Sequence, residues 1–390
     1  MDPTKAKWNF GIRMATSIPQ TLSSATFAKL SPHPYLLANL QPSDPSTTPS
    51  SRTNGRLPTE ARRPAINTSS LSHAHGSAMV RTGDTTVICG VRGETLATSQ
   101  IPNYRASTHT GTSTSNGETD EIRVYDLLVP NIELATGSAP NLLPGVPPTT
   151  LAQTLITRLY SLLHSSGILN AEDLRIYHDK TAVSDENDED MQDADNEAEE
   201  EEDTREVKAY WVLYIDILFV SLDGNPFDAA WAAVLAALRD TKLPKAYWDA
   251  DREMVVCSRP QRSSSSGGTN TVPLSVRGLP VACTAAVFTA KDRLKQMQMQ
   301  TQSLGQGRTA SESFWILVDP DRFEEGLCDE TVTVVVDRSG LGIKGEGEEK
   351  ETKILSISKS GGTMVGPEVL RRFVKVAEDR WQVFRDIFGS

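Results

Sequence analysis

Residues 209–222 read Ala209-Tyr-Trp-Val-Leu-Tyr-Ile-Asp-Ile-Leu-Phe-Val-Ser-Leu222 and are nearly all apolar. Many of them are β-branched or aromatic, which favours a strand, and an unbroken apolar run predicts burial on both faces. The run breaks at Asp223-Gly-Asn-Pro226 and resumes as an alanine-rich stretch at 227–239. Proline suits the first turn of a helix, because the N–H that it lacks has no helical partner there. The sequence therefore predicts a central strand, a tight turn and a packed helix in an α/β core.

Further strand and helix signals lie on both sides of this segment. Strands are predicted at 76–83, 85–94, 124–134 and 174–177 before it, and at 281–288, 314–319, 331–337 and 355–358 after it. Apolar residues at helical spacing predict helices at 151–165 and 367–388, and a short helix near 27–40 that is interrupted around Pro32 and Pro34. Both halves thus consist of strands in series followed by a covering helix, and an internal duplication is one interpretation of this pattern.

The charge of the chain is unevenly distributed. The 390 residues carry a net charge of -12, yet residues 185–203 hold 13 acidic residues and no Lys or Arg. Without this segment, 38 acidic and 39 basic side chains nearly balance. We therefore expect a disordered acidic insert on an almost neutral folded part. The four cysteines form no CxxC pair and no long apolar segment opens the chain, which favours the nucleus or cytoplasm over secretion.

Several short motifs occur along the chain in a particular order. They are Arg52-Thr-Asn-Gly-Arg56, Gly76-Ser-Ala-Met-Val-Arg-Thr-Gly-Asp-Thr-Thr-Val-Ile-Cys-Gly-Val91 with Glu94, Asn131-Ile-Glu-Leu134, Glu172-Asp-Leu174, Trp211-Val-Leu-Tyr-Ile-Asp216, Leu222-Asp-Gly-Asn-Pro-Phe-Asp-Ala-Ala230, and Val318-Asp-Pro320 with Glu324-Glu325. Each motif is weak by itself. Their order and spacing, from about residue 27 to 388, resemble the RNase PH family and, within it, the non-catalytic ring subunits of the exosome.

This resemblance implies a duplicated βαβα fold of the type found in domain 2 of ribosomal protein S5. It also implies a six-membered ring that threads single-stranded RNA. The expected partners are RNase PH-like ring subunits, S1/KH cap proteins and a recruited 3′–5′ nuclease. Neither a cofactor nor a membrane is expected to take part. RNA degradation and rRNA processing in the nucleus, nucleolus and cytoplasm would follow. The expected organisation is an N-terminal arm at 1–50, a first subdomain at 51–248 with the acidic insert at 185–206, a flexible connection at 249–275 and a C-terminal subdomain at 276–390.

Active members of the family cleave RNA with inorganic phosphate, using an Asp-Gly-Gly-Thr motif that enters a helix. Glycines allow backbone N–H groups to approach the phosphate closely. The resemblance places this motif at Phe227-Asp-Ala-Ala-Trp231, where alanines replace the glycines and Trp231 replaces the threonine. We therefore expect no catalysis, and interpret Asp228 as a structural residue at the positive end of the helix. If Asp228 is instead a general acid, the chain is an active phosphate-dependent 3′–5′ exoribonuclease; a free interaction module is a third hypothesis.

Five arginines are candidates for contact with RNA. Phosphate contacts require only positive charge within reach, and a ring can supply it from several subunits. The alternative is that these arginines are ordinary solvated surface residues. No metal site is predicted, since His73 and His75 have no accompanying Cys or carboxylate cluster. The candidates for RNA contact are Arg52, Arg56, Arg62, Arg63 and Arg105.

Overall fold

The computed structural model describes residues 23–42, 49–102, 104, 121–144, 147–179, 205–258, 271–290, 314–328, 330–339, 352–361 and 366–389. The chain forms two compact units, Met1–Leu57 and Pro58–Ser390. Several predictions lie outside the described residues: the first part of the N-terminal arm, most of the polar loop that contains Arg105, the acidic segment at 185–203 and the Ser/Gly-rich stretch at 262–270.

The first unit contains two short helices, α1 (Ser24–Leu30) and α2 (Pro32–Leu40). The side chain of Ser23 accepts a hydrogen bond from the backbone N–H of Thr26 and so caps the start of α1. The predicted interruption at Pro32 is confirmed, because α2 begins at this residue. Pro34 causes no second break, since it lies in the first turn of α2, where its N–H would have no helical partner.

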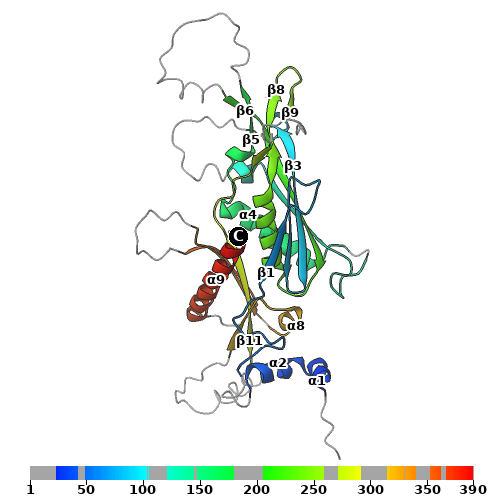
Figure 1. The fold of residues 1–390 in the computed structure, drawn as a ribbon, viewed down its shortest axis with the longest axis vertical. Coiled ribbons are helices and arrows are strands. Elements are labelled where there is room, and N and C mark those ends of the chain that lie inside the picture. Colours follow the sequence, from blue (N-terminus) through cyan, green and yellow to red (C-terminus); the bar gives the residue numbers. More distant parts are fainter. Residues whose placement is uncertain are drawn as a thin grey trace, which may run out of the picture. The chain divides into compact units, whose positions relative to one another are not determined.

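The second unit begins with a six-stranded sheet (Figure 1). Its strands run in the order β1 (Pro64–Thr68), β2 (Gly76–Thr82), β3 (Thr85–Ala97), β6 (Arg205–Ser221) and β4 (Leu128–Leu134), and β5 (Arg175–Asp179) also pairs with β6. Only β4 is parallel to its partner β6. The prediction of a strand at 124–134 was wrong at its start, because residues 121–124 are helical and Asp126 has a positive φ of 48° that ends the turn.

Strand β6 is central, as predicted, because it pairs with β3, β4 and β5. Residues 209–213 are all buried, which confirms burial on both faces for the first half of the predicted strand. Beyond residue 213 the pattern alternates, with Asp216 and Val220 exposed. The prediction of burial on both faces was therefore wrong for the second half, where only one face of the strand is covered. The predicted acidic insert also ends earlier than expected, since residues 205 and 206 already belong to β6.

Helix α6 (Pro226–Asp240) connects this sheet to a second one. The second sheet is fully antiparallel and has the order β12 (Phe314–Val318), β11 (Val281–Thr289), β13 (Glu330–Asp337) and β14 (Lys353–Ser360). On one side α6 contacts β1, β2, β3 and β6, and on the other it contacts β11. All α6 residues from Phe227 to Leu238 are buried, as expected for a helix packed on all sides.

Two further long helices pack against the sheets. Helix α4 (Thr150–Ser166) contacts β4 and α6, and α9 (Pro367–Phe388) contacts β11 and β13 (Figure 1). No helix in the part of the chain that the structure describes is long and apolar enough to cross a membrane. The mixed α/β fold predicted from the sequence is confirmed. The smaller elements are η1 (Thr98–Gln100), η2 (Glu172–Leu174), β7 (Lys242–Pro244), β8 (Ala246–Asp249), β9 (Met254–Cys257), β10 (Thr271–Pro273) and α8 (Arg322–Glu325).

Candidate functional site

The turn between β6 and α6 lies against the second half of the unit. Gly224 has a positive φ of 72°, and a Cβ built on it would lie 2.5 Å from the backbone carbonyl carbon of Asp321. Only glycine fits such an approach, because it has no Cβ and tolerates a positive φ. Asn225 follows with a φ of 47°, and the helix begins at Pro226. The segment around Asp321 therefore covers the entrance of the helix.

This geometry corrects the placement of the family motif. Phe227-Asp-Ala-Ala-Trp231 lies inside the first turns of α6, whereas the residues that enter the helix are Asp223-Gly-Asn-Pro226. The entering stretch retains the Asp-Gly of an Asp-Gly-Gly-Thr motif and has asparagine and proline at its third and fourth positions. Trp231 is buried, and its indole N–H donates to the Pro280 carbonyl at 2.8 Å.

Two backbone positions at this helix entrance offer no free donor. The N–H of Asn225 donates to Oε1 of Glu325 at 2.7 Å, and Pro226 has no N–H. A helix entrance attracts anions because its free N–H groups point outward. Here the carboxyl group of Glu325 binds the Asn225 N–H, and when it is ionised its charge would repel a phosphate group.

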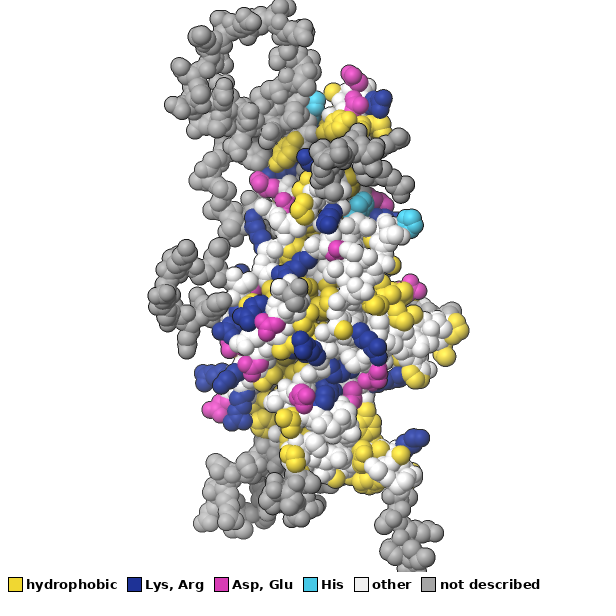
Figure 2. Space-filling view, viewed as in Figure 1, with side chains coloured by type: hydrophobic (Ala, Val, Ile, Leu, Met, Phe, Trp, Pro, Cys, Tyr) yellow, Lys and Arg dark blue, Asp and Glu magenta, His cyan; other side chains and the backbone are white. Residues whose placement is uncertain are grey.

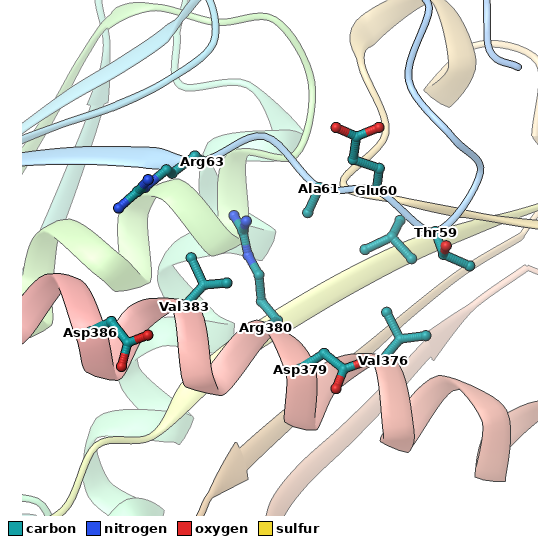
Figure 3. Close-up of a pocket in the computed structure, with 10 residues that line it drawn as sticks. Thr59, Glu60, Ala61, Arg63, Val376, Asp379, Arg380, Val383 and Asp386 are labelled. Carbon is teal, nitrogen blue, oxygen red and sulfur yellow. The ribbon is translucent and has the colours of Figure 1, made fainter.

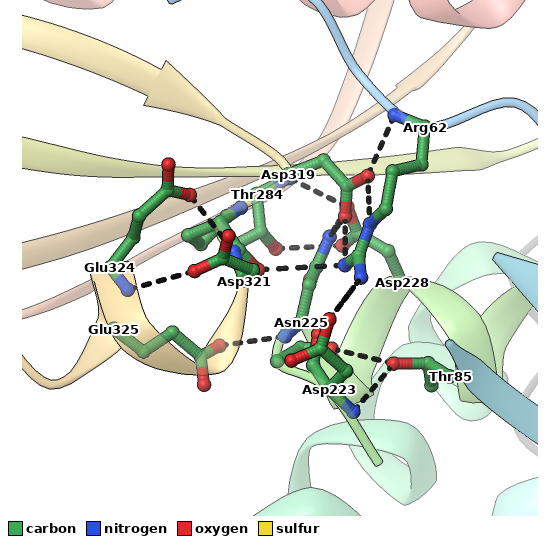
Figure 4. A network of polar contacts seen from close by, with 12 residues as sticks. Arg62, Thr85, Asp223, Asn225, Asp228, Thr284, Asp319, Asp321, Glu324 and Glu325 are labelled. Atoms are coloured by element: carbon green, nitrogen blue, oxygen red, sulfur yellow. Dashed lines mark hydrogen bonds and ion pairs between the residues drawn. The ribbon is translucent and has the colours of Figure 1, made fainter. Parts of the chain in front are cut away.

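Asp228 belongs to the same cluster, and it is buried (Figure 4). Its carboxyl group accepts hydrogen bonds from the backbone N–H of Thr284 at 2.8 Å, from the Thr284 hydroxyl at 2.6 Å and from Nδ2 of Asn225 at 2.9 Å. The interpretation of Asp228 as a structural residue fits these contacts. They differ from a cap, however, because the side chain binds β11 and the Asn225 side chain rather than backbone N–H groups of its own helix.

Arg62 and Asp319 form the second part of the cluster (Figure 4). Nε of Arg62 donates to Oδ2 of Asp319 and Nη2 donates to Oδ1, both at 2.8 Å. Nη1 of Arg62 donates to the backbone carbonyl of Asp223 at 2.8 Å. Asp319 also accepts from Nδ2 of Asn225 at 2.8 Å. A forked ion pair of this kind, with its side chains 11% and 2% exposed, joins the segment before β1 to the end of β12.

The pKa values follow from this burial and pairing. Burial alone would raise the pKa of Asp319, but the hydrogen bonds and charge of Arg62 outweigh it and lower the pKa to about 2. Asp228 has no such cation in hydrogen-bonding contact, so burial raises its pKa in spite of its hydrogen bonds to Thr284 and Asn225. Burial likewise raises the pKa of Glu325 to about 7, against the opposing effects of the Asn225 N–H and Arg62.

Replacing Glu325 with glutamine should increase stability at pH 8 and have a much smaller effect at pH 5. The pKa of Glu325 rises from 4.5 to about 7 on folding, so neutral Glu325 favours the folded state at low pH. This contribution is lost as the pH rises through about 7, and at about 1.4 kcal/mol per unit it amounts to at most about 3.5 kcal/mol. Glutamine keeps an oxygen for the Asn225 N–H and cannot ionise.

The measurement is the difference in urea unfolding free energy between Glu325→Gln and the unmodified chain, at pH 5 and pH 8. The exposed Glu133 provides a matched Glu→Gln control with no expected change in this difference. An equal effect of Glu325→Gln at both pH values would contradict the prediction.

The structure separates the five arginines that were predicted to contact RNA. Arg62 is held in the forked pair with Asp319, and Arg105 lies outside the described residues. Arg52 is buried and Arg56 is half-buried. Arg63 is exposed, beside the turn of α9 that carries Arg380, in a groove of about 540 Å³ (Figure 3).

The surroundings of Arg63 are not uniformly basic. The same groove carries the acidic side chains of Glu60, Asp379 and Asp386 (Figure 3). On the face drawn in Figure 2, basic and acidic side chains are interspersed over α9 and form no continuous basic track. Contact between RNA and Arg52, Arg56, Arg63 or Arg105 stays a prediction.

No role was predicted for the residues that complete the cluster. Asn225, Asp319 and Glu325 occur only as parts of the short motifs, and Thr284 belongs to none of them. Their partners lie far away in the chain: the hydrogen bonds of Asp228 to Thr284 and of Arg62 to Asp319 span 56 and 257 residues. The structure also shows the surroundings of His75, one of the two histidines considered as metal ligands. Nδ1 of His75 accepts a hydrogen bond from the N–H of Gly93. No group of three or more possible metal ligands occurs among the described residues.

Comparison with known proteins gives the family. Residues 60–244 match the model of the RNase PH type, "3′ exoribonuclease family, domain 1". Residues 60–244 form an RNase PH domain. This domain begins just before Arg62 and ends with β7, so Thr284, Asp319 and Glu325 lie outside it. The polar cluster therefore fastens the RNase PH domain to the sheet that follows it.

Relatives extend the likeness beyond the RNase PH domain. The chain is 27% identical over 361 residues to the exosome complex component rrp43 of Schizosaccharomyces pombe, covering 93% of this chain and 96% of that protein. It is 22% identical over 357 residues to the exosome complex component Rrp42 of Archaeoglobus fulgidus, covering 91% and 94%. A chain in the structure of the Archaeoglobus fulgidus exosome with RNA bound to the active site has the same fold, with a TM-score of 0.55, 22% identity and coverage of 91% and 97%.

Proposed function

We propose that this chain is a non-catalytic, RNA-guiding ring subunit of an exosome, which supports 3′–5′ RNA degradation and rRNA processing. Two findings support membership of a ring. The chain carries an RNase PH domain, and its likeness to exosome components of a yeast and an archaeon extends over nearly the whole of both chains. Its partners would be other RNase PH-like ring subunits, S1/KH cap proteins, a recruited 3′–5′ nuclease and single-stranded RNA, in the nucleus, nucleolus and cytoplasm.

The observation that carries the non-catalytic assignment is the occupied helix entrance. Phosphorolysis requires a bound phosphate and an acid near the departing 3′ oxygen. At the start of α6, the N–H of Asn225 is bound to the Glu325 carboxyl group and Pro226 offers no donor. Asp228 is buried, and Thr284 and Asn225 bind its oxygens. This set of contacts supports cohesion between the two halves rather than chemistry on RNA.

The alternative, an active phosphate-dependent 3′–5′ exoribonuclease, has one observation in its favour. The side chain of Asp223, at the first position of the entering stretch, is 40% exposed and could reach a substrate. Its nearest cation is Arg62, with Nη1 3.6 Å from Oδ2 of Asp223. Asp223 therefore replaces Asp228 as the residue to test for a general acid.

The deciding experiment supplies single-stranded RNA and inorganic phosphate and measures the release of nucleoside diphosphates. It is performed on the purified full-length chain and on a reconstituted exosome whose hydrolytic nuclease is inactivated. We expect no phosphate-dependent release from either sample, and no effect of Asp223→Asn or Asp228→Asn on RNA degradation by the active complex. A release that falls about 10²–10⁴-fold in Asp223→Asn or Asp228→Asn would establish the enzyme instead. Failure of the chain to co-purify with RNase PH-like subunits would reject the ring assignment.

For RNA guidance, Arg63 is the candidate of choice, because its side chain is exposed and Arg62 beside it is held by Asp319. In the reconstituted ring, Arg63→Gln should weaken binding of single-stranded RNA. The slope of the logarithm of the binding constant against the logarithm of the salt concentration should fall by the value of about one phosphate contact. An unchanged salt dependence would remove Arg63 from the RNA path.

A further inference from the structure

A small pocket lies between α4 and the second sheet, beside the first turn of α6. Its volume is about 170 Å³. Helix α4 contributes Arg158, Ser161 and Ser165, whose spacing of three and seven residues places them on one helix face. Strand β14 contributes Ser356 and Ser358, which are two residues apart and therefore lie on the same face of the sheet.

The remaining polar group of the pocket comes from the neighbouring strand. Thr333 of β13 pairs directly with Ser358 of β14 and also lines the pocket. Phe227 forms one wall. Phe227 and Asp228 are adjacent in the first turn of α6, and Asp228 binds Thr284 while Phe227 lines this pocket. The pocket is therefore distinct from the occupied helix entrance.

Among the described residues that line the pocket, Arg158 is the only charged one. Its guanidinium carbon lies 4.0 Å from the ring centroid of Phe227, an attraction that requires no hydrogen-bond acceptor. Among the described residues, none accepts a hydrogen bond from Arg158 or forms an ion pair with it. Burial lowers the pKa of Arg158, and the charge of Asp228 only partly opposes this effect. A guanidinium remains charged in proteins and carries five N–H donors. Within the described part of the chain, the donors of this half-buried cation are therefore available to a bound anion.

The pocket also contains hydroxyl groups around Arg158 that can donate hydrogen bonds. The side chains of Ser161, Ser356 and Ser358 form no hydrogen bond with any described residue. Ser165 and Thr333 are already engaged, with the Leu162 carbonyl and with Thr284. Hydroxyl and guanidinium donors around one space are suited to the oxygen atoms of an anion. No Asp or Glu is among the described residues that line it, so none of these residues is a general acid.

We propose that this pocket binds a single phosphate group, either free inorganic phosphate or one phosphate of an RNA strand. Its volume of about 170 Å³ is below the roughly 300–1,000 Å³ of sites that enclose a whole drug-sized ligand. A phosphate group therefore enters, and any attached nucleoside stays outside. The binding of free phosphate does not depend on the ring function proposed above, and without an acid in the pocket it leads to no phosphorolysis.

The first test titrates inorganic phosphate into the purified full-length chain at constant ionic strength, with calorimetry as the readout. We expect a dissociation constant in the millimolar range, typical of one small ligand with few contacts. Arg158→Gln should weaken binding about 10–100-fold, the value of hydrogen bonds to a charged group. Arg239→Gln is the matched control: Arg239 also lies over a phenylalanine, Phe388, at 4.9 Å, but Nη2 of Arg239 donates to the Gly278 carbonyl.

A second variant keeps the test decisive if Arg158→Gln fails to fold. The double change Ser356→Ala and Ser358→Ala retains the cation and removes two hydroxyl groups, and it should weaken phosphate binding while leaving the melting temperature nearly unchanged. Two results would overturn the proposal: no binding by the unmodified chain at tens of millimolar phosphate, or equal binding by the unmodified chain and a folded pocket variant.

A competition experiment identifies the source of the phosphate. A short single-stranded RNA and its methylphosphonate analogue, which has an uncharged backbone, are added to the phosphate-loaded chain. Displacement of phosphate by RNA but not by the analogue assigns the pocket to the RNA backbone. Absence of displacement assigns it to free phosphate. Failure of the ring proposal would be seen in co-purification and would leave the phosphate titration unchanged.

Discussion

Replacing Arg62 with methionine is expected to lower the unfolding free energy of the chain by about 3–5 kcal/mol, the cost of removing one partner of a buried ion pair. The change removes both branches of the fork to Asp319 and the hydrogen bond to the Asp223 carbonyl. The Asp319 side chain is only 2% exposed, so its charge would be left buried without a cation. Urea unfolding of the full-length chain, followed by circular dichroism, provides the measurement.

Arg63→Met is the matched control for this prediction. Arg63 is adjacent in sequence and exposed, so its replacement should change the unfolding free energy by no more than about 0.5 kcal/mol. The coupling also has a pH dependence with a definite sign. Because the pKa of Asp319 is lowered from 3.8 to about 2, its stabilising contribution is present above about pH 4 and is lost as the pH falls toward 2. Equal losses in the Arg62 and Arg63 variants at pH 7 would show that the fork contributes nothing.

Replacing Trp231 with alanine is expected to lower the unfolding free energy by about 3–5 kcal/mol as well. The side chain is 1% exposed and lies in α6 between the two sheets. Its indole N–H also donates to the Pro280 carbonyl just before β11, which would lose its donor. The expected loss therefore combines a large cavity with an unsatisfied buried acceptor.

Two further variants separate these contributions. Trp231→Phe keeps an aromatic ring and removes the N–H, so it should cost less, about 1–3 kcal/mol for the unpaired carbonyl. Trp248→Ala removes the same side chain from β8, where it is only half-buried, and should cost less than half as much as Trp231→Ala. If Trp231→Ala and Trp248→Ala were equally stable, α6 would not be the element that holds the two sheets together.

Arg62 and Trp231 both form contacts between the two sheets, close to the start of α6. Arg62 connects the segment before β1 to Asp319, and Trp231 connects α6 to the residue before β11. Both contacts join the RNase PH domain to the second sheet. A rigid connection of this kind is suited to a subunit whose proposed role is to hold a position in a ring, because subunit interfaces require a fixed relative placement of their parts.

The sequence determined the long elements of the fold and their order, but not the start of the strand predicted at 124–134 or the short strands β1 and β7 to β10. The apolar run at 209–222 predicted β6, Pro226 predicted the start of α6, and the helical spacing of apolar residues predicted α4 and α9. These signals are local, since strand and helix periodicity and turn residues act within a few positions of the chain. The order of short motifs also sufficed to indicate the RNase PH family, which the match over residues 60–244 confirms.

Local signals were insufficient where a neighbouring element decides the outcome. The sequence predicted burial of β6 on both faces, but Asp216 and Val220 are exposed because the second half of the strand is covered on one face only. It also placed the family motif at 227–231 rather than at 223–226, because the start of the helix depends on the turn at Gly224 and on the backbone that approaches it.

Only the tertiary structure decided what the polar residues do. Asp228 lies in the first turn of its helix, as predicted, but its side chain binds Thr284 rather than capping the helix. Arg62, a candidate for contact with RNA, binds Asp319. These partners are 56 and 257 residues away, on strands brought together by the burial of α6 between two sheets. Apolar patterning specifies which faces of an element are buried. The partner of a buried charge depends instead on where folding places the other charges. No periodicity in the sequence encodes which two charges become neighbours.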